Sequence, residues 1–303
     1  MKPKINFFCI GAQKAGTTTL HNILKQHPDI YLPQIKEAQF FDLNERYSKG
    51  IDFYYNQFYT DYQDEKIMGN INPNLSIDNR SIDRIIETYG RNNIKILFIL
   101  RNPVERAHSH YLMSKMRGYE TLTFKEAIIK EKERISNPKI HNEYKTKELG
   151  HFEKNHYGYI YRSRYLKTIN KIISEFPVYN TKILLFEDFL KDKHSFIGEI
   201  LNFLELSFPK EIDIDIKSNS AQVIRSTNVQ NLMRIAGPVK YIIPTKIRSK
   251  LKNQITQINR KEIKHSDYDI SINEKRKIYE NYFKHEIQKI ETVLQKSLDN
   301  WKY

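Results

Sequence analysis

The chain has 303 residues, a formal net charge of +14, and a composition that is 39% hydrophobic and 28% charged. These proportions are typical of a soluble globular protein with enough residues for a large core. The single cysteine, Cys9, excludes an internal disulfide and a cysteine-rich metal site. No apolar run reaches the roughly 20 residues of a membrane span, so we expect a cytoplasmic protein.

The basic excess indicates an anionic partner. There are 50 Lys and Arg residues against 36 Asp and Glu, and such a charge attracts anions over long range. The partner attracted by this positive charge could be nucleic acid, a membrane surface, an acidic glycan or a nucleotide. A lysine-rich solvated surface would give the same net charge without any partner.

Short apolar runs alternate with helical patterns along the chain. Strands are predicted at residues 5–10, 66–72, 93–100 and 181–187. Helices are predicted at residues 17–27, 81–90, 104–116, 165–176 and 195–206, and a long amphipathic helix at 272–301. Residues 115–157 and 210–264 are polar and basic, and we interpret them as helical insertions and loops. Continuous apolar strands, each followed by a helix, predict an α/β fold with a P-loop-like parallel sheet flanked by helices on both faces.

The first strand leads into a glycine-bounded loop, "IGAQKAGTTTL". Gly11 and Gly16 have the separation found in a P-loop, but Lys14 lies inside the loop and not after the second glycine. We expect the amides from Ala15 to Thr19 to point, unpaired, at an anion on the helix N-terminus. Further donors come from the hydroxyls of Thr17, Thr18 and Thr19. The alternative is a helix that the threonines simply cap.

A second anion site is predicted where the strand at 93–100 ends. Arg101 follows this strand, and Asn102 and Pro103 are typical of the first positions of a helix. Ser109 lies about two turns further on, and an arginine with a hydroxyl can hold one phosphate. An Mg²⁺-dependent nucleotidase needs a carboxylate at this strand end, so the arginine indicates direct phosphate binding without metal. An ordinary surface arginine remains the alternative.

Several segments resemble the sulfotransferases that use PAPS, 3′-phosphoadenosine 5′-phosphosulfate. "IGAQKAGTTTL" is similar to their 5′-phosphosulfate loop, and "ILRNPVERAHSHY" to their 3′-phosphate motif. "KEAQFFD", residues 36–42, resembles the segment with the catalytic glutamate in heparan sulfate sulfotransferases. "RSRYLKTINKIISEFPVYNTKILLFEDFL" is similar to the adenosine-side helix and strand, and "LQKSLDNW" to a closing motif of the glycan-sulfating branch. The resemblance covers nearly the whole chain and implies one domain over residues 1–303.

The resemblance also implies roles. The chain would move a sulfuryl group from PAPS to a hydroxyl or amine of a glycan or glycan precursor, releasing 3′,5′-ADP without a metal. Lys14 would stabilise charge on the bridging oxygen, together with the loop amides. Arg101 and Ser109 would hold the 3′-phosphate, and Glu37 would be the general base. From the residues alone, "KEAQFF" shows only a charged pair before an apolar run, which is typical of a solvated strand edge.

Some positions depart from the family pattern. Relatives often have Glu, sometimes followed by Lys, before a Ser/Thr-Pro, and here Asn70 and Ile71 take those places. Ser163 stands where the adenosine-side helix of the family has glycine, while Tyr165 keeps the aromatic position. Arg225, in "KSNSAQVIRSTN", is a candidate for a loop that closes on the cofactor.

Two other functions stay open beside glycan sulfation. The same chemistry could act on a small-molecule metabolite or a lipid-linked headgroup. A non-catalytic basic protein that binds nucleic acid or acidic polysaccharide would instead show steep salt dependence and no nucleotide preference. We expect the enzyme, with a sulfate acceptor and no nucleic acid as its partner. The oligomeric state has no signal in the sequence.

Overall fold

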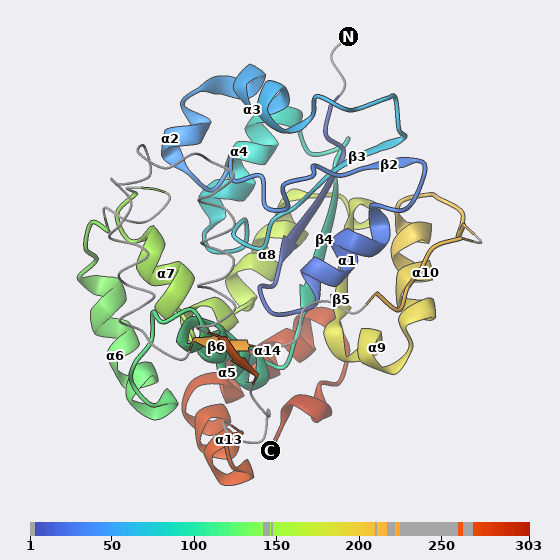
Figure 1. Ribbon diagram of the computed structural model, residues 1–303. Coiled ribbons are helices and arrows are strands. Elements are labelled where there is room, and N and C mark those ends of the chain that lie inside the picture. Colours follow the sequence, from blue (N-terminus) through green and yellow to red (C-terminus); the bar gives the residue numbers. More distant parts are fainter. Residues whose placement is uncertain are drawn as a thin grey trace. The chain divides into compact units, whose positions relative to one another are not determined.

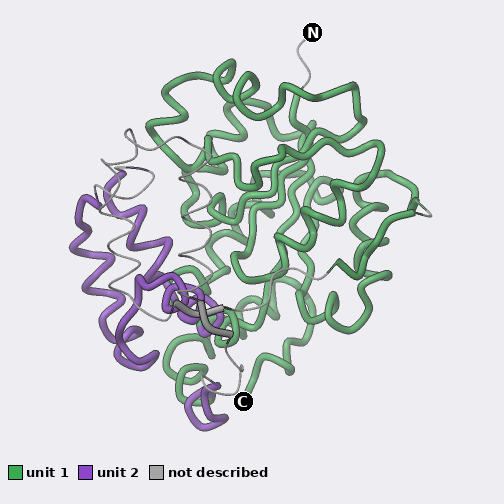
Figure 2. Tube along the Cα trace, viewed as in Figure 1, with its two compact units in different colours: residues 1–107, 160–218, 276–303 green, residues 108–159, 219–275 purple. Residues whose placement is uncertain are grey.

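A computed structural model describes residues 4–141, 146, 148–209, 211–216, 222–224, 260–262 and 269–303. The chain divides into two compact units, coloured separately in Figure 2. The first unit comprises residues 1–107, 160–218 and 276–303, and the second comprises residues 108–159 and 219–275. One domain over residues 1–303 stays a prediction.

The first unit is built on a parallel five-stranded sheet with the order β2-β3-β1-β4-β5. The central strand pairs on both sides, since Phe7 lies opposite Gly69 of β3 and Lys95 of β4. Buried residues fill β1 completely, as expected for a strand covered on both faces. The strands are β1 (Phe7–Gly11), β2 (Ile30–Tyr31), β3 (Ile67–Ile71), β4 (Lys95–Leu100) and β5 (Thr181–Leu185). This sheet confirms the predicted α/β fold.

Helices cover this sheet on both faces. Figure 1 shows α1 on the near side of the strands and α8 on the far side. Gly90, with a φ of +80°, ends α4 where the sequence predicts its end. The helices of this unit include α1 (Thr17–Leu24), α2 (Asn44–Tyr47), α3 (Gly50–Phe58), α4 (Asn79–Tyr89), α8 (Leu166–Glu175), α9 (Phe186–Lys191), α10 (Lys193–Phe203) and α14 (Lys284–Leu294).

An aromatic cluster packs against the β1 side of the core. Phe40 stacks on Tyr54 with ring centroids 4.5 Å apart, and Phe41 meets Phe8 of β1 edge-on at 5.7 Å. All four rings are buried. Because Phe40 and Phe41 follow directly on the segment that contains Glu37, burial of these rings anchors that segment to the sheet.

The second unit contains most of α5 (Pro103–Met116), which begins in the first unit, together with α6 (Phe124–Ser136) and α7 (His151–Tyr157). A capping box between Thr123 and Glu126 starts α6. Within this unit Arg134 and the Tyr159 hydroxyl both donate to the buried carboxylate of Glu120, at 2.6 and 2.7 Å. The strands β6 (Gln222–Ile224) and β7 (Arg260–Glu262) pair antiparallel.

The helix near the C-terminus is shorter than predicted. It consists of α13 (Ile272–Ile278), a π-helical segment (Tyr279–Phe283) and α14. The last of these ends where Gln295 adopts a left-handed φ of 50°. The predicted continuation to Trp301 is wrong. The Leu298 amide donates to Glu291 Oε1 at 2.8 Å, which turns the chain back and lets the Trp301 ring become fully buried.

Candidate active site

The candidate site lies at the carboxyl edge of the sheet in the first unit. The order β2-β3-β1-β4-β5 sends the chain after β1 toward one side and the chain after β4 toward the other. Open α/β sheets bind ligands in the crevice that such a divergence leaves. The loop after β1, the segment after β2 and Arg101 after β4 all belong to this edge.

The loop after β1 holds two residues in the left-handed conformation. Lys14 has a φ of 73° and Gly16 a φ of 76°. Gly16 is the N-cap of α1, offers no side-chain acceptor, and is followed by a first turn without an acidic residue. Such a helix end leaves amide donors and a partial positive charge for an anion. The expectation that the Ala15 amide is unpaired is wrong, because this amide donates to the Ala12 carbonyl at 3.1 Å.

Gly16 also packs closely against Phe186, the residue directly after β5. A β-carbon at this position would lie 2.7 Å from Cε2 of Phe186, closer than side chains approach one another in proteins. The same Phe186 ring lies under the Arg101 guanidinium, 5.3 Å from the carbon at its centre. The ring therefore leaves no room for a side chain at Gly16 and supports the arginine through a cation–π contact.

Arg101 is linked to the loop directly. Its Nη1 donates to the Lys14 carbonyl at 2.9 Å, and its own carbonyl accepts from the Tyr165 hydroxyl at 2.9 Å. The two predicted anion-binding residues are thus brought together by a hydrogen bond between β4 and the loop after β1. Tyr165 is the aromatic residue that the sequence places in the adenosine-side helix.

The residue after Arg101 confirms the predicted helix start. Asn102 Oδ1 accepts from the Val104 amide at 3.0 Å, and α5 begins at Pro103. The main-chain amide of Asn102 donates to Glu187 Oε1 at 2.8 Å. The carboxylate that follows β5 is therefore engaged in holding the end of β4.

Glu37 comes to the start of α1 through its neighbour Lys36. Lys36 Nζ lies 2.9 Å from Glu37 Oε1 and 3.4 Å from Thr17 Oγ1. The Lys36 side chain is 17% exposed and that of Glu37 40%. Glu37 has a φ of 66°, so the two predicted catalytic residues, Lys14 and Glu37, are both non-glycine residues in the left-handed region. Such conformations are sparsely populated and are concentrated at functional sites.

The segment after Glu37 is held by arginines that bind its main chain. Arg46 Nη1 donates to the Gln39 carbonyl at 3.0 Å, and Arg84 Nη1 to the Phe41 carbonyl at 3.0 Å. Arg80 Nη2 donates to the Asp42 carbonyl at 3.2 Å. These three arginines have no signal in the sequence, because each contact joins residues of separate elements.

Asn70 supports the same segment from β3. Its amide donates to the Ala38 carbonyl at 3.3 Å and to the Tyr54 hydroxyl. Asn70 stands where relatives often have an acidic residue, and here it fixes the main chain next to Glu37. Its neighbour Ile71 is buried in the sheet.

Asp42 is a buried carboxyl at this edge of the sheet. Its Oδ1 accepts from Asn72 Nδ2 at 3.1 Å, while Oδ2 has no hydrogen-bond partner among the described residues. Burial raises the pKa of Asp42 to about 7. The sequence contains Asp42 within "KEAQFFD" but gives no sign that the carboxyl is buried.

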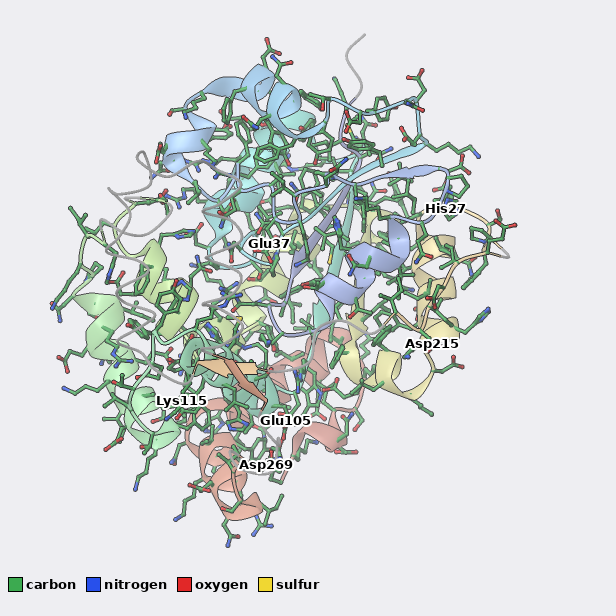
Figure 3. The ribbon with its side chains drawn as sticks, viewed as in Figure 1. His27, Glu37, Glu105, Lys115, Asp215 and Asp269 are labelled. Carbon is green, nitrogen blue, oxygen red and sulfur yellow. The ribbon has the colours of Figure 1, made fainter. Side chains whose placement is uncertain are left out.

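His21, within α1, and His27, just after it, differ in their surroundings. Both ring nitrogens of His27 are engaged, since Nδ1 accepts from the Asp29 amide at 3.0 Å and Nε2 lies 3.0 Å from the Ser207 carbonyl. Figure 3 shows His27 well away from Glu37. Burial, followed by the charge of Lys36, lowers the pKa of His21 to about 4. His27 is therefore structural, and His21 is neutral at physiological pH.

Ser109 belongs to the second unit and is half-buried on α5. Its pairing with Arg101 stays a prediction. The flanking His110 is structural, because its Nε2 lies 2.7 Å from the Asn155 carbonyl. Arg225 lies outside the described residues.

Neither a metal-binding cluster nor a membrane-spanning helix occurs among the described residues. They contain no group of three or more His, Cys, Asp or Glu side chains placed to hold a metal ion. Among the same residues, no helix combines the length and apolar character that crossing a bilayer requires.

The chain is similar to known proteins over nearly its whole length. The family model described as "Sulfotransferase domain" matches residues 4–298. Over 111 residues the chain is 36% identical to membrane-associated sulfotransferase kil1 of Dictyostelium discoideum, covering 36% of this chain and 23% of that protein. Over 102 residues it is 34% identical to heparan sulfate glucosamine 3-O-sulfotransferase 5 of Mus musculus, covering 34% and 28%. The chain thus matches about a quarter of the length of these curated relatives.

A solved structure has the same fold. The sulfotransferase from Alicyclobacillus acidocaldarius matches with a TM-score of 0.65 and 24% identity, covering 99% of each chain. The two chains therefore share their fold over almost their whole lengths.

Proposed function

This chain belongs to the sulfotransferase domain family and is a transferase by that membership, and we propose that it moves a sulfuryl group from PAPS to a hydroxyl or amine. One observation carries the proposal most strongly. The N-terminus of α1 lies between the Lys14 loop, which Arg101 holds, and the Lys36–Glu37 pair. An anion-binding helix end and a carboxylate thus lie on one edge of the sheet.

The residues present fit a ligand with two separate anionic groups. The amides of Gly16 and Thr17, the Thr17 and Thr18 hydroxyls and Lys14 would receive the phosphosulfate, and Thr19 lies in the same turn. Gly16 provides no competing cap, and no acidic residue occupies the first turn of α1. Arg101 would hold the 3′-phosphate, and a part for Ser109 stays a prediction. A guanidinium is suited to this because its planar donors match phosphate oxygens.

The proposed chemistry assigns one task to each side chain. PAPS, when bound, supplies the sulfuryl group and leaves as 3′,5′-ADP. Glu37 takes the proton of the acceptor as the acceptor oxygen or nitrogen forms its bond to sulfur. Lys14 and the first-turn amides of α1 stabilise the negative charge that grows on the bridging oxygen. This assignment uses no metal ion.

We propose a glycan or glycan precursor as the acceptor. The match to a heparan sulfate glucosamine 3-O-sulfotransferase and the net charge of +14 support an acidic sugar polymer. The match covers a third of this chain, and a small-molecule acceptor would use the same base and anion site.

Transfer of labelled sulfate from PAPS to a panel of acceptors tests the proposal. The panel contains heparosan, desulfated heparin, aryl alcohols and amines, with Glu37→Gln as the catalytic control. Label on a polysaccharide supports glycan sulfation, and label only on small molecules moves the acceptor assignment to metabolites. Absence of transfer together with absence of 3′,5′-ADP binding would contradict the enzyme assignment.

A further inference from the structure

One lysine in the site has no role in the proposed reaction so far. Lys36 precedes Glu37 and bonds both Glu37 Oε1, at 2.9 Å, and Thr17 Oγ1, at 3.4 Å. Thr17 is the first residue of α1, so the ammonium lies between the proposed base and the helix end that would receive the anion. The 17% exposure of its side chain shows that it is mostly shielded from water.

We propose that Lys36 is a positioning residue that holds Glu37 beside the anion site and offsets the repulsion between this carboxylate and the bound anion. The proposal rests on the proposed function. It assigns Lys36 no bond to the reacting atoms and needs only the two contacts that the structure shows.

The physical need for such a cation follows from the charges. A general base must approach the acceptor where the acceptor meets the sulfuryl group, so its carboxylate lies close to a multiply charged anion. Like charges within a few ångströms, partly shielded from solvent, repel strongly. An ammonium between the two attracts both, because it donates to the carboxylate and contributes positive charge at the helix end.

The main chain explains why Lys36 is suited to the task. Glu37 has a φ of 66°, which fixes the turn between the two side chains. The following residues are tied down, since Asn70 donates to the Ala38 carbonyl at 3.3 Å and Phe40 is buried. With the backbone held in this way, the lysine–carboxylate geometry is set before any ligand binds.

A double-mutant cycle on 3′,5′-ADP binding isolates the proposed effect. The variants are Lys36→Met, Glu37→Gln and the double variant, with dissociation constants measured by calorimetry. We expect Lys36→Met to weaken binding about tenfold, because it leaves the carboxylate uncompensated beside the anion. Glu37→Gln should not weaken binding. The double variant should recover about threefold or more relative to Lys36→Met alone.

Matched variants separate charge from packing. Lys36→Arg keeps the charge and should retain most of the wild-type affinity. Lys25→Met removes an exposed lysine at the other end of α1 and should change binding less than twofold, as distant solvated charges do. Thermal unfolding of each variant checks that it is folded. If Lys36→Met does not fold, Lys36→Arg and Lys36→Gln complete the cycle.

The outcomes distinguish this proposal from the proposed function. Binding by the wild type with equal losses in Lys36→Met and the double variant would overturn the role of Lys36 and leave the proposed function intact. Wild-type protein that does not bind 3′,5′-ADP would overturn the proposed function and this role with it.

Discussion

Nη1 of Arg101 donates a 2.9 Å hydrogen bond to the main-chain carbonyl of Lys14. The arginine follows β4 and the lysine lies in the loop after β1, and these two strands are neighbours in the sheet. Lys14 needs this support because its φ of 73° is unfavourable for a residue with a side chain. A hydrogen bond therefore joins the loop proposed for the phosphosulfate to the arginine proposed for the 3′-phosphate.

Lys14→Ala and Arg101→Ala should affect different kinetic constants. In the proposed reaction Lys14 would contact charge that grows in the transition state, so its loss should fall mainly on kcat. Arg101 would contact a phosphate that does not change in the reaction, so its loss should mainly raise the dissociation constant of 3′,5′-ADP, with a smaller loss of kcat because Arg101 also supports the Lys14 loop. Steady-state kinetics and calorimetry measure both effects. Arg91→Ala, which removes a surface arginine paired with Glu175, is the control. Two variants that lose only affinity would contradict the role of Lys14.

3′,5′-ADP should stabilise the folded protein more than ADP does, because only the former carries a 3′-phosphate for Arg101. At about 100 times its dissociation constant a ligand adds roughly 2.7 kcal/mol to the free energy of unfolding. A rise in Tm of several degrees follows for a chain of this size. Thermal shift with both nucleotides measures the difference, and the Arg101→Ala variant should abolish it. Equal shifts from both nucleotides in the wild type would remove the 3′-phosphate assignment.

Glu37→Gln should lower kcat by about 10²- to 10⁴-fold, the usual contribution of a general base. The amide has almost the same shape as the carboxylate, so folding and 3′,5′-ADP affinity should be retained. Glu45→Gln, at an exposed position on α2, should leave kcat unchanged. Near-normal turnover in Glu37→Gln with intact binding would mean that another group serves as base. His21, which is neutral and buried, would then be the residue to substitute.

Gly16→Ala should both destabilise the fold and weaken 3′,5′-ADP binding. Gly90→Ala should destabilise the fold without changing this binding. Both glycines have a φ near +80°, so alanine costs about 1–3 kcal/mol at either position. Only at Gly16 does the new methyl group meet the Phe186 ring, at 2.7 Å, and this ring supports Arg101. Chemical denaturation and calorimetry on both variants test the difference. Equal binding by the two variants would contradict a role for the Gly16–Phe186 contact in the site.

Asp42 should make stability depend on pH between about 4 and 7. Its folded-state pKa of about 7 lies above the ordinary value of 3.8, so the folded state binds the extra proton in this range. Its contribution to the free energy of unfolding is fully present below pH 4 and falls as pH rises through 7. The difference between wild type and Asp42→Asn in urea unfolding should therefore change by up to about 1.4 kcal/mol per pH unit. A constant difference from pH 4 to 8 would show that Asp42 is ionised in the folded state.

The local order of the fold follows from the sequence. Apolar runs and helical periods predict β1, β3, β4 and β5, and the glycine at 90 predicts the end of α4. The loop with Lys14 and the position of Arg101 at a strand end are likewise evident, because each is set by residues adjacent in the chain. The family match over residues 4–298 confirms the resemblance that these motifs indicate.

Side-chain partners across the sheet edge could not be predicted in this way. Lys36 and Thr17 meet across 19 positions, and Arg101 and the Lys14 carbonyl across 87. These hydrogen bonds depend on the strand order, which places β1 between β3 and β4. They also depend on the buried rings that anchor the segment after Glu37. The sequence by itself determined which chemical groups the site has. The tertiary structure decided which of them touch, because packing and not spacing along the chain brings separate loops within hydrogen-bonding distance.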